Sequence, residues 1–107
     1  MALMVVDFDI LMDDDTVSRP IYNKFIVELR RGRTKQQISF DGNRCFISTP
    51  EDIYALANRL IGAEILRIDK DVLSIIDVRS KKLFVWGSCN MKIFGEFPNF
   101  SIVTLSK

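Results

Sequence analysis

The shortness of the links between apolar segments in the C-terminal part of the chain is the strongest constraint on its fold. Beyond Gly62, links of at most four residues separate segments rich in branched and aromatic side chains. A parallel connection needs a crossover of about a dozen residues, so such links join antiparallel neighbours. We therefore predict an antiparallel meander of strands at residues 63–68, 72–78, 82–87, 90–97 and 100–106.

The N-terminal part also shows alternation of apolar and polar residues. Val6, Phe8 and Ile10 alternate with two aspartates, which predicts a half-buried strand over residues 5–11. A polar loop over residues 12–20 follows. The alternation in residues 21–30 and 34–40 predicts a hairpin whose tip is the sequence RRGR, residues 30–33. A second turn at residues 41–43 leads to a short strand at 44–48.

One segment, residues 48–62, has the pattern of a helix. Thr49 can cap it, and Pro50 suits its first position, where no backbone donor is needed. Gly62 is a natural stop. The apolar residues repeat at i, i+3, i+4, i+7 and i+8, which predicts one buried face; they are Ile53, Leu56, Ala57, Leu60 and Ile61.

Together these elements predict an α+β domain. The sheet is mostly antiparallel, with about eight strands and a C-terminal meander, and one central helix packs on one face. A length of 107 residues fits a single domain over residues 1–107. Nearly half of the residues are hydrophobic, which is enough for a packed core.

The composition argues against an enzyme. The chain contains no histidine, the side chain best suited to proton transfer near neutral pH. Its two thiols, Cys45 and Cys89, cannot form a closed zinc site without imidazole, and we expect both to be buried and free. No glycine-rich strand-to-helix turn is present, so we expect no nucleotide cofactor, and indeed no cofactor or resident metal at all.

One short segment resembles a known catalytic motif. The apolar strand that ends in Asp7-Phe8-Asp9 is similar to the first motif of the haloacid dehalogenase superfamily. The resemblance implies that one aspartate is a nucleophile and the next handles the proton. That family continues with a small turn and a Thr or Val, whereas Ile10 and Leu11 extend the strand here. Its parallel sheet with alternating helices does not fit the short links, so we expect two solvent-facing carboxylates.

Charge is distributed unevenly along the chain, although the net charge is only +1. The first eighteen residues carry five acids and no cation, whereas residues 19–35 carry six cations and one acid. The run Asp13, Asp14 and Asp15 lacks the spacing of a calcium loop, so weak cation binding stays an alternative to an exposed acidic loop. The RRGR tip has no aromatic residue for base stacking, so we do not expect nucleic acid as a partner.

These features favour a protein-binding or inhibitory module, such as a toxin-neutralising immunity protein or a phage- or plasmid-encoded inhibitor. We expect Asp13, Asp14 and Asp15 to form its recognition loop, with Arg31 and Arg33 as a second patch and a partner that carries a basic surface. Trp86 shares a strand face with Phe84, which either packs under a second layer or anchors a partner. A self-associating structural subunit, such as a homodimer, is the alternative, and a carboxylate-dependent hydrolase is a third.

The N-terminal segment gives no sign of a membrane span or a signal peptide. It begins with apolar residues, but Asp7 and Asp9 interrupt it before either could form. We therefore expect a cytoplasmic protein without membrane contact.

Overall fold

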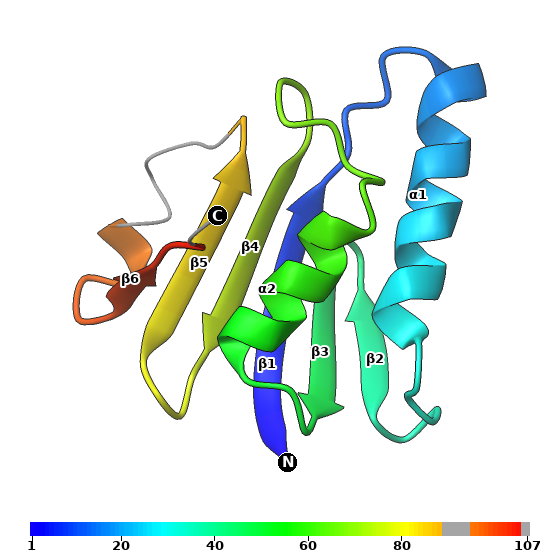
Figure 1. The fold of residues 1–107 in the computed structure, drawn as a ribbon. Coiled ribbons are helices and arrows are strands. Elements are labelled where there is room, and N and C mark those ends of the chain that lie inside the picture. The colour runs from blue at the N-terminus through cyan, green and yellow to red at the C-terminus, as the bar shows by residue number, and fades with distance from the viewer. Residues whose placement is uncertain (89–94, 106–107) are drawn as a thin grey trace.

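The structure, a computed structural model, describes residues 1–88 and 95–105. This part of the chain forms a two-layer α+β domain with a six-stranded mixed sheet and two helices (Figure 1). The strand order is β2-β3-β1-β4-β5-β6. In chain order the elements are β1 (Ala2–Asp9), α1 (Asp15–Arg30), β2 (Ile38–Asp41), β3 (Arg44–Thr49), α2 (Ile53–Gly62), β4 (Val72–Asp77), β5 (Lys82–Gly87) and β6 (Ser101–Val103).

The first six elements follow the split βαβ topology. Strand β1 lies at the centre and pairs antiparallel with both β3 and β4, and β2 pairs antiparallel with β3. The order β1–α1–β2–β3–α2–β4 is the βαββαβ arrangement of ferredoxin-like domains. A hairpin adds β5 beside β4, and β6 then pairs with β5 in parallel. This topology fixes the fold class but says nothing about activity.

The core lies between the sheet and the helices. Met4, Val6 and Phe8 of β1 are buried on one face, as the alternation predicted. The ring of Phe25 from α1 packs on Phe8 with centroids 5.1 Å apart, and Leu60 of α2 joins the same cluster. Figure 1 shows α2 in front of the central strands and α1 alongside it towards the β2 edge.

The predicted hairpin over residues 21–40 is wrong, because residues 15–30 form helix α1. Asp14 caps the helix, since its carboxylate accepts a hydrogen bond from the Thr16 amide at 3.1 Å. The side chains that face the core are spaced at i, i+3, i+4, i+7, i+8 and i+11, which is a helical stripe. They are Ser18, Ile21, Tyr22, Phe25, Ile26 and Leu29.

Helix α2 confirms the predicted helix, but it begins later than expected. Its cap is Asp52, which accepts from the Ala55 amide at 2.8 Å. Thr49 is instead the buried last residue of β3, and its hydroxyl accepts from the Glu51 amide at 3.1 Å. The predicted apolar face is confirmed, since Ile53, Leu56, Ala57 and Leu60 are buried and Ile61 is partly buried.

The C-terminal part matches the predicted meander only in the β4–β5 hairpin. Residues 63–71 form turns rather than a strand. Strand β6 is parallel to β5, with Leu83 opposite Ile102, so the connection between them is a crossover and not a tight turn. Most of the strand predicted at residues 90–97 falls outside the described residues. The expectation of about eight strands and one helix is therefore corrected to the six strands and two helices above.

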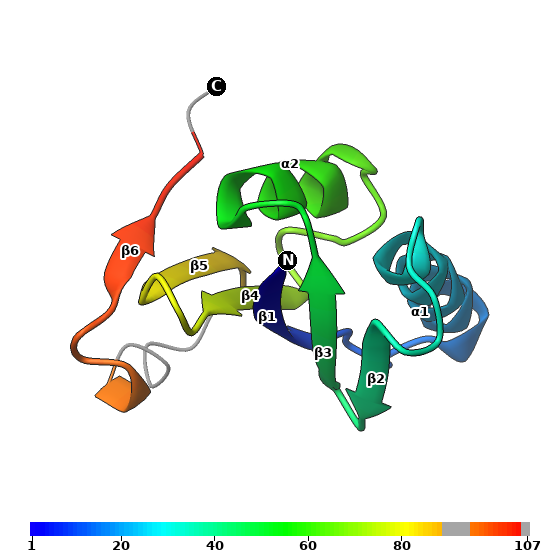
Figure 2. The ribbon, with the colours of Figure 1, turned by 90° about the horizontal axis from the view of Figure 1, so that it is seen from below.

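The sheet face opposite the helices is covered in part. In Figure 2 the described end of the β5–β6 connection lies across the sheet from α2. Leu83 and Ile76 are buried on this face, whereas Leu3 is 51% exposed and Phe46 is 37% exposed. The described helices include none that is long and apolar enough to cross a membrane.

Candidate functional site

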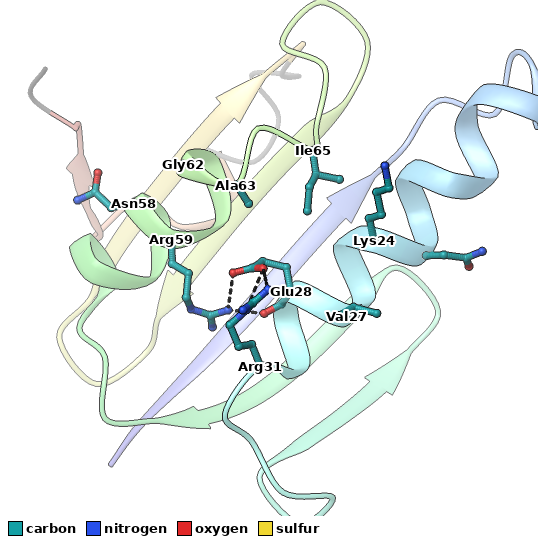
Figure 3. A pocket seen from close by; sticks show the side chains of 10 residues that line it. Lys24, Val27, Glu28, Arg31, Asn58, Arg59, Gly62, Ala63 and Ile65 are labelled. Carbon is teal, nitrogen blue, oxygen red and sulfur yellow. Dashed lines mark hydrogen bonds and ion pairs between the residues drawn. The ribbon is translucent and has the colours of Figure 1, made fainter.

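A groove of about 800 Å³ separates α1 from α2 (Figure 3). One face of each helix supplies its walls, and the turn after α2 closes one end. The lining residues are Asn23, Lys24, Val27, Glu28 and Arg31 from α1, Asn58, Arg59 and Gly62 from α2, and Ala63 and Ile65 beyond it.

Arg59 holds the two walls of this groove together. Its Nε lies 2.8 Å from Oε2 of Glu51, and its Nη2 lies 3.0 Å from Oε1 of the same carboxylate. Its Nη1 donates to the backbone carbonyl of Glu28 and lies 3.4 Å from that residue's carboxylate. Arg31 binds the other oxygen of Glu28 at 3.0 Å. The hydrogen bonds from Arg59 lower the pKa of Glu51, so this carboxylate stays ionised near neutral pH.

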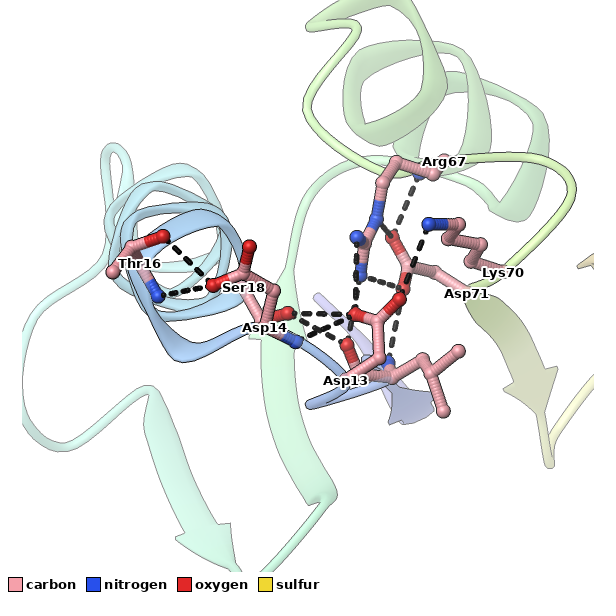
Figure 4. Close-up of polar contacts among 8 residues, drawn as sticks. Asp13, Asp14, Thr16, Ser18, Arg67, Lys70 and Asp71 are labelled. Atoms are coloured by element: carbon pink, nitrogen blue, oxygen red, sulfur yellow. Dashed lines mark hydrogen bonds and ion pairs between the residues drawn. The ribbon is translucent and has the colours of Figure 1, made fainter.

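A second ion-pair network joins the loop after β1 to the loop before β4 (Figure 4). At its centre is Asp71, whose side chain is fully buried. One carboxylate oxygen accepts from the Leu11 amide at 3.0 Å, and the other accepts from the Arg67 amide at 2.8 Å. The Arg67 guanidinium binds both oxygens and donates to the Leu11 carbonyl at 2.9 Å. Burial alone would raise the pKa of Asp71, but these hydrogen bonds outweigh it and lower the pKa.

Asp13 extends this network to the surface. Its carboxylate lies 3.1 Å from Nζ of Lys70 and 3.6 Å from the guanidinium of Arg67, and the Ser18 hydroxyl donates to it at 3.3 Å. The hydrogen bond from Lys70 contributes most to lowering the pKa of Asp13 to about 2. Asp13 therefore has a defined structural role in addition to its predicted role as a recognition residue.

The other two aspartates of the predicted recognition loop also lie in helix α1 or at its start. Asp14 is the helix cap, and Asp15 forms an exposed i,i+4 pair with Arg19 at 3.1 Å. Asp14 and Asp15 thus form the N-terminus of a helix rather than part of a loop, and Asp13 directly precedes it. Contact of these aspartates with a partner stays a prediction.

Four large apolar side chains are exposed on the same two loops and the first turn of α1. The exposed fractions are 47% for Leu11, 51% for Met12, 47% for Val17 and 65% for Ile68. We call residues 11–17 together with 67–70 the acidic tip. It carries four carboxylates and two cations around these apolar groups.

Arg31 and Arg33 do not lie at a hairpin tip. Arg31 is the C-cap of α1, and Gly32 turns the chain with φ of 72°. Arg33 folds back onto β3, where its Nη1 donates to the Ser48 carbonyl at 3.4 Å. The two guanidiniums therefore belong to the basic end of α1, where cations complement the helix dipole.

Trp86 and Phe84 lie on the same face of β5, as their alternation predicted, and the structure shows that this face is turned towards the helices. Phe84 is buried, and Trp86 is half-buried and packs against the core. Both line a smaller pocket of about 370 Å³ between α2 and β6. A second layer therefore covers much of this pair, and a role of Trp86 in binding a partner stays a prediction.

The segment that resembles the haloacid dehalogenase motif lies in a different fold context. Strand β1 has antiparallel neighbours on both sides, which differs from the parallel sheet of that family. Asp7 faces away from the helices and forms a bidentate pair with Arg44, at 2.7 and 3.0 Å. Asp9 is exposed. The two carboxylates do not converge on a helix-lined site.

Few of the described side chains are arranged as a metal site or as a reactive nucleophile. Within residues 1–88 and 95–105, no three His, Cys, Asp or Glu side chains are grouped as a metal site. Cys45 is a buried free thiol, as predicted, and burial raises its pKa to about 11. A thiol with this pKa is a poor nucleophile. Cys89 lies outside the described residues.

No protein-family model, curated protein or solved structure matches the chain.

Proposed function

We propose that the protein is a non-catalytic protein-binding or inhibitory module, and that the acidic tip is its main contact surface. The observation that carries the proposal is the combination of four exposed apolar side chains with carboxylates held in place by the Asp71 network. Protein interfaces commonly have an apolar centre and a polar rim. Single exposed apolar residues are common on protein surfaces and do not indicate a binding site. Four of them on adjoining segments do indicate one.

The charge of the acidic tip indicates the chemistry of the partner. Asp14, Asp15 and Asp69 are exposed, and none of these three forms an ion pair with Lys70 or Arg67, which pair with Asp13. A basic surface with apolar groups between its cations would complement it. Exposed charges of this kind mainly accelerate association, and salt screens them.

Rigidity of the acidic tip supports the same proposal. The two loops are joined by the buried Asp71 carboxylate and by the Arg67 guanidinium, at distances between 2.8 and 3.1 Å. A surface that is already ordered loses little conformational entropy when it binds. The order of the acidic tip therefore supports a role in binding a partner.

Self-association is the alternative function, and it rests on other surfaces. Strands β2 and β6 are the edges of the sheet. Leu3 and Phe46 are exposed on the face opposite the helices. A structural subunit would assemble through these features and not through the acidic tip.

The test compares two variants that each replace an exposed branched apolar residue by Asp. Ile68→Asp lies in the acidic tip, where Ile68 is 65% exposed, and the control Val78→Asp lies in the turn after β4, where Val78 is 51% exposed. Immobilised wild-type and variant proteins are used to capture partners from the native host, which mass spectrometry identifies. We expect one protein to bind the wild type and Val78→Asp but not Ile68→Asp. Equal capture by all three, or a stable closed oligomer of the chain alone in light scattering, would overturn the proposal.

A further inference from the structure

We infer that the groove between α1 and α2 is a second binding surface, which accepts an acidic segment of another protein. This inference goes beyond the proposed function and does not depend on the acidic tip, because it concerns other residues and a partner of opposite charge. It rests on the shape, charge and unused hydrogen-bonding groups of the groove.

The groove has the size and relief to accept a segment of polypeptide. Its volume of about 800 Å³ falls in the range of about 300–1,000 Å³ that is typical of ligand sites. Val27 projects from the last turn of α1 and is 64% exposed. On the opposite wall Gly62 and Ala63 have little or no side chain, and a Cβ added at Gly62 would meet nothing within 4 Å. The groove therefore has apolar surface and free space side by side (Figure 3).

The charged groups of the groove are mostly cations. Lys24, Arg31 and Arg59 line it, against the single carboxylate of Glu28. Glu28 is already paired with the two guanidiniums. Lys24 is exposed and forms no ion pair with any other described residue. The unbalanced charge is positive, so the complementary ligand is acidic.

The cationic surface continues past the end of the groove. Arg30 precedes Arg31 in the chain, and Arg33 and Lys35 follow it. Their side chains extend the positive field beyond the groove, and no carboxylate occurs between Glu28 and Asp41 in the sequence. Arg59 is already paired with Glu51 and Glu28, so the positive charge available to a ligand is spread over the other cations along this surface. A segment with several acidic residues therefore fits the surface better than a small anion does.

The rim also offers hydrogen-bonding groups without partners among the described residues. Asn23 and Asn58 are among the lining residues, and the side chain of neither forms a hydrogen bond within residues 1–88 and 95–105. Each amide supplies two donors and an acceptor, which can bind the backbone of a docked segment. The groove holds no aromatic side chain on which a base could stack, so a peptide fits it better than single-stranded nucleic acid.

The test uses a defined probe, a short fluorescein-labelled helical peptide of Glu, Leu and Ala, together with the same peptide in which Lys replaces Glu. Fluorescence anisotropy measures binding, and amide chemical shifts of the wild-type protein locate it. We expect the acidic peptide to bind and to shift the amides of Lys24, Val27 and Gly62. We expect the basic peptide not to bind at the groove.

Two pairs of variants assign the site. Lys24→Glu reverses a groove charge, and Lys81→Glu makes the same change in the exposed β4–β5 turn. Gly62→Phe fills the groove, and Gly62→Ala leaves it open. We expect Lys24→Glu and Gly62→Phe each to weaken the acidic peptide about tenfold or more, a loss typical of a contact residue in an interface, and both controls to bind like the wild type.

Three results would overturn the inference. They are no binding of the acidic peptide to the wild type, equal binding of the basic peptide, and equal weakening by Lys81→Glu, which would indicate only long-range attraction. Each of these would leave the capture experiment on Ile68 unaffected, so failure of the groove and failure of the acidic tip are distinguishable.

Discussion

At the scale of the residue, Arg59 is the charged group that joins the two helices. Its side chain is 19% exposed and contacts Glu51 and Glu28 at once. Its removal leaves Glu51 without its bidentate partner and Glu28 paired only with Arg31, and a partly buried charge that loses its partner is destabilising. We predict that Arg59→Ala lowers the free energy of unfolding by about 2–4 kcal/mol, as measured by urea denaturation.

Arg19→Ala is the matched control for this prediction. It removes an exposed i,i+4 pair with Asp15, and such pairs contribute little because solvent screens them. We expect its urea midpoint to stay close to that of the wild type. Equal destabilisation by both changes would contradict the assigned role of Arg59.

Two glycines provide a second comparison at this scale. Gly87 has φ of 96°, and an added Cβ would lie 2.0 Å from the Asp71 carbonyl oxygen. Gly62 is helical and has open space around it. We predict that Gly87→Ala lowers the free energy of unfolding by more than about 2 kcal/mol. Gly62→Ala should raise it by up to about 1 kcal/mol, and thermal unfolding of both variants checks the opposite signs.

The sequence did not predict these networks, because their members are far apart along the chain. Arg59 and Glu28 are separated by 31 positions, and Leu11 and Asp71 by 60. A single charged residue carries no signal about which distant residue will face it. The acidic run at Asp13 was noticed in the sequence, but its pairing with Lys70 could only come from the fold.

At the scale of the element, helix α1 shows how a short pattern can mislead. The alternation of Phe25, Val27 and Leu29 favoured a strand, with Lys24, Glu28 and Arg30 on the other face, although Ile26 breaks this pattern. The helical stripe from Ser18 to Leu29 is longer, and within it Val27 falls on the exposed side. Pro20 made the preceding residues look like a loop, although it lies inside the helix. The buried stripe and the end of helix α2 were predicted correctly, but its start was not, since Asp52 and not Thr49 is the cap.

The start of α1 gives a prediction about this element. Asp14 accepts hydrogen bonds from the amide and the hydroxyl of Thr16 at 3.1 and 2.7 Å. Asp14→Ala should lower the free energy of unfolding by about 1 kcal/mol, whereas Asp14→Asn keeps a good cap and should cost much less. Urea denaturation of the two variants measures the difference. Similar losses in both would mean that charge rather than capping holds the helix start.

The same cap decides how the acidic tip can be tested. Replacing Asp13, Asp14 and Asp15 together by Ala would weaken binding and the helix at once, since the first is paired with Lys70 and the second is a cap. The variant Asp14→Asn separates the two effects, because Asn is still a good helix cap.

The ends of the C-terminal strands could not be predicted from the sequence. The length of the β5–β6 connection depends on where each strand ends, and the apolar segments did not show those ends.

At the scale of the whole molecule, charge is separated along α1. The acidic tip lies at its N-terminal end, and Arg30, Arg31 and Arg33 lie at its C-terminal end. Both groups complement the dipole of the helix, so the separation stabilises α1 while it presents two surfaces of opposite sign. The polarisation was visible in the sequence. The fold shows in addition that the groove between α1 and α2 lies beside the basic end of α1 and that exposed apolar side chains lie among the carboxylates at its acidic end.

The ion-pair networks also predict how the whole molecule responds to acid. The pKa values of Glu51 and Asp71 are lowered in the folded protein, and that of Asp13 is lowered to about 2. A depressed carboxyl pKa gives stability that is fully present above the unfolded-state pKa and is lost as pH falls through the folded-state value. The free energy of unfolding should therefore decline as the pH falls below the ordinary values of 3.8 for Asp and 4.5 for Glu.

Glu51→Gln isolates one part of this response. The variant is expected to be less stable than the wild type at pH 7, because the bidentate pair with Arg59 is lost. The two should become more alike as the pH falls below about 4.5, where the unfolded chain takes up its proton first, and then passes through the lowered pKa of folded Glu51. Urea denaturation from pH 7 to pH 3 measures both curves. A difference in free energy that stays constant over this range would show that ionisation of Glu51 contributes nothing to the bridge between the helices.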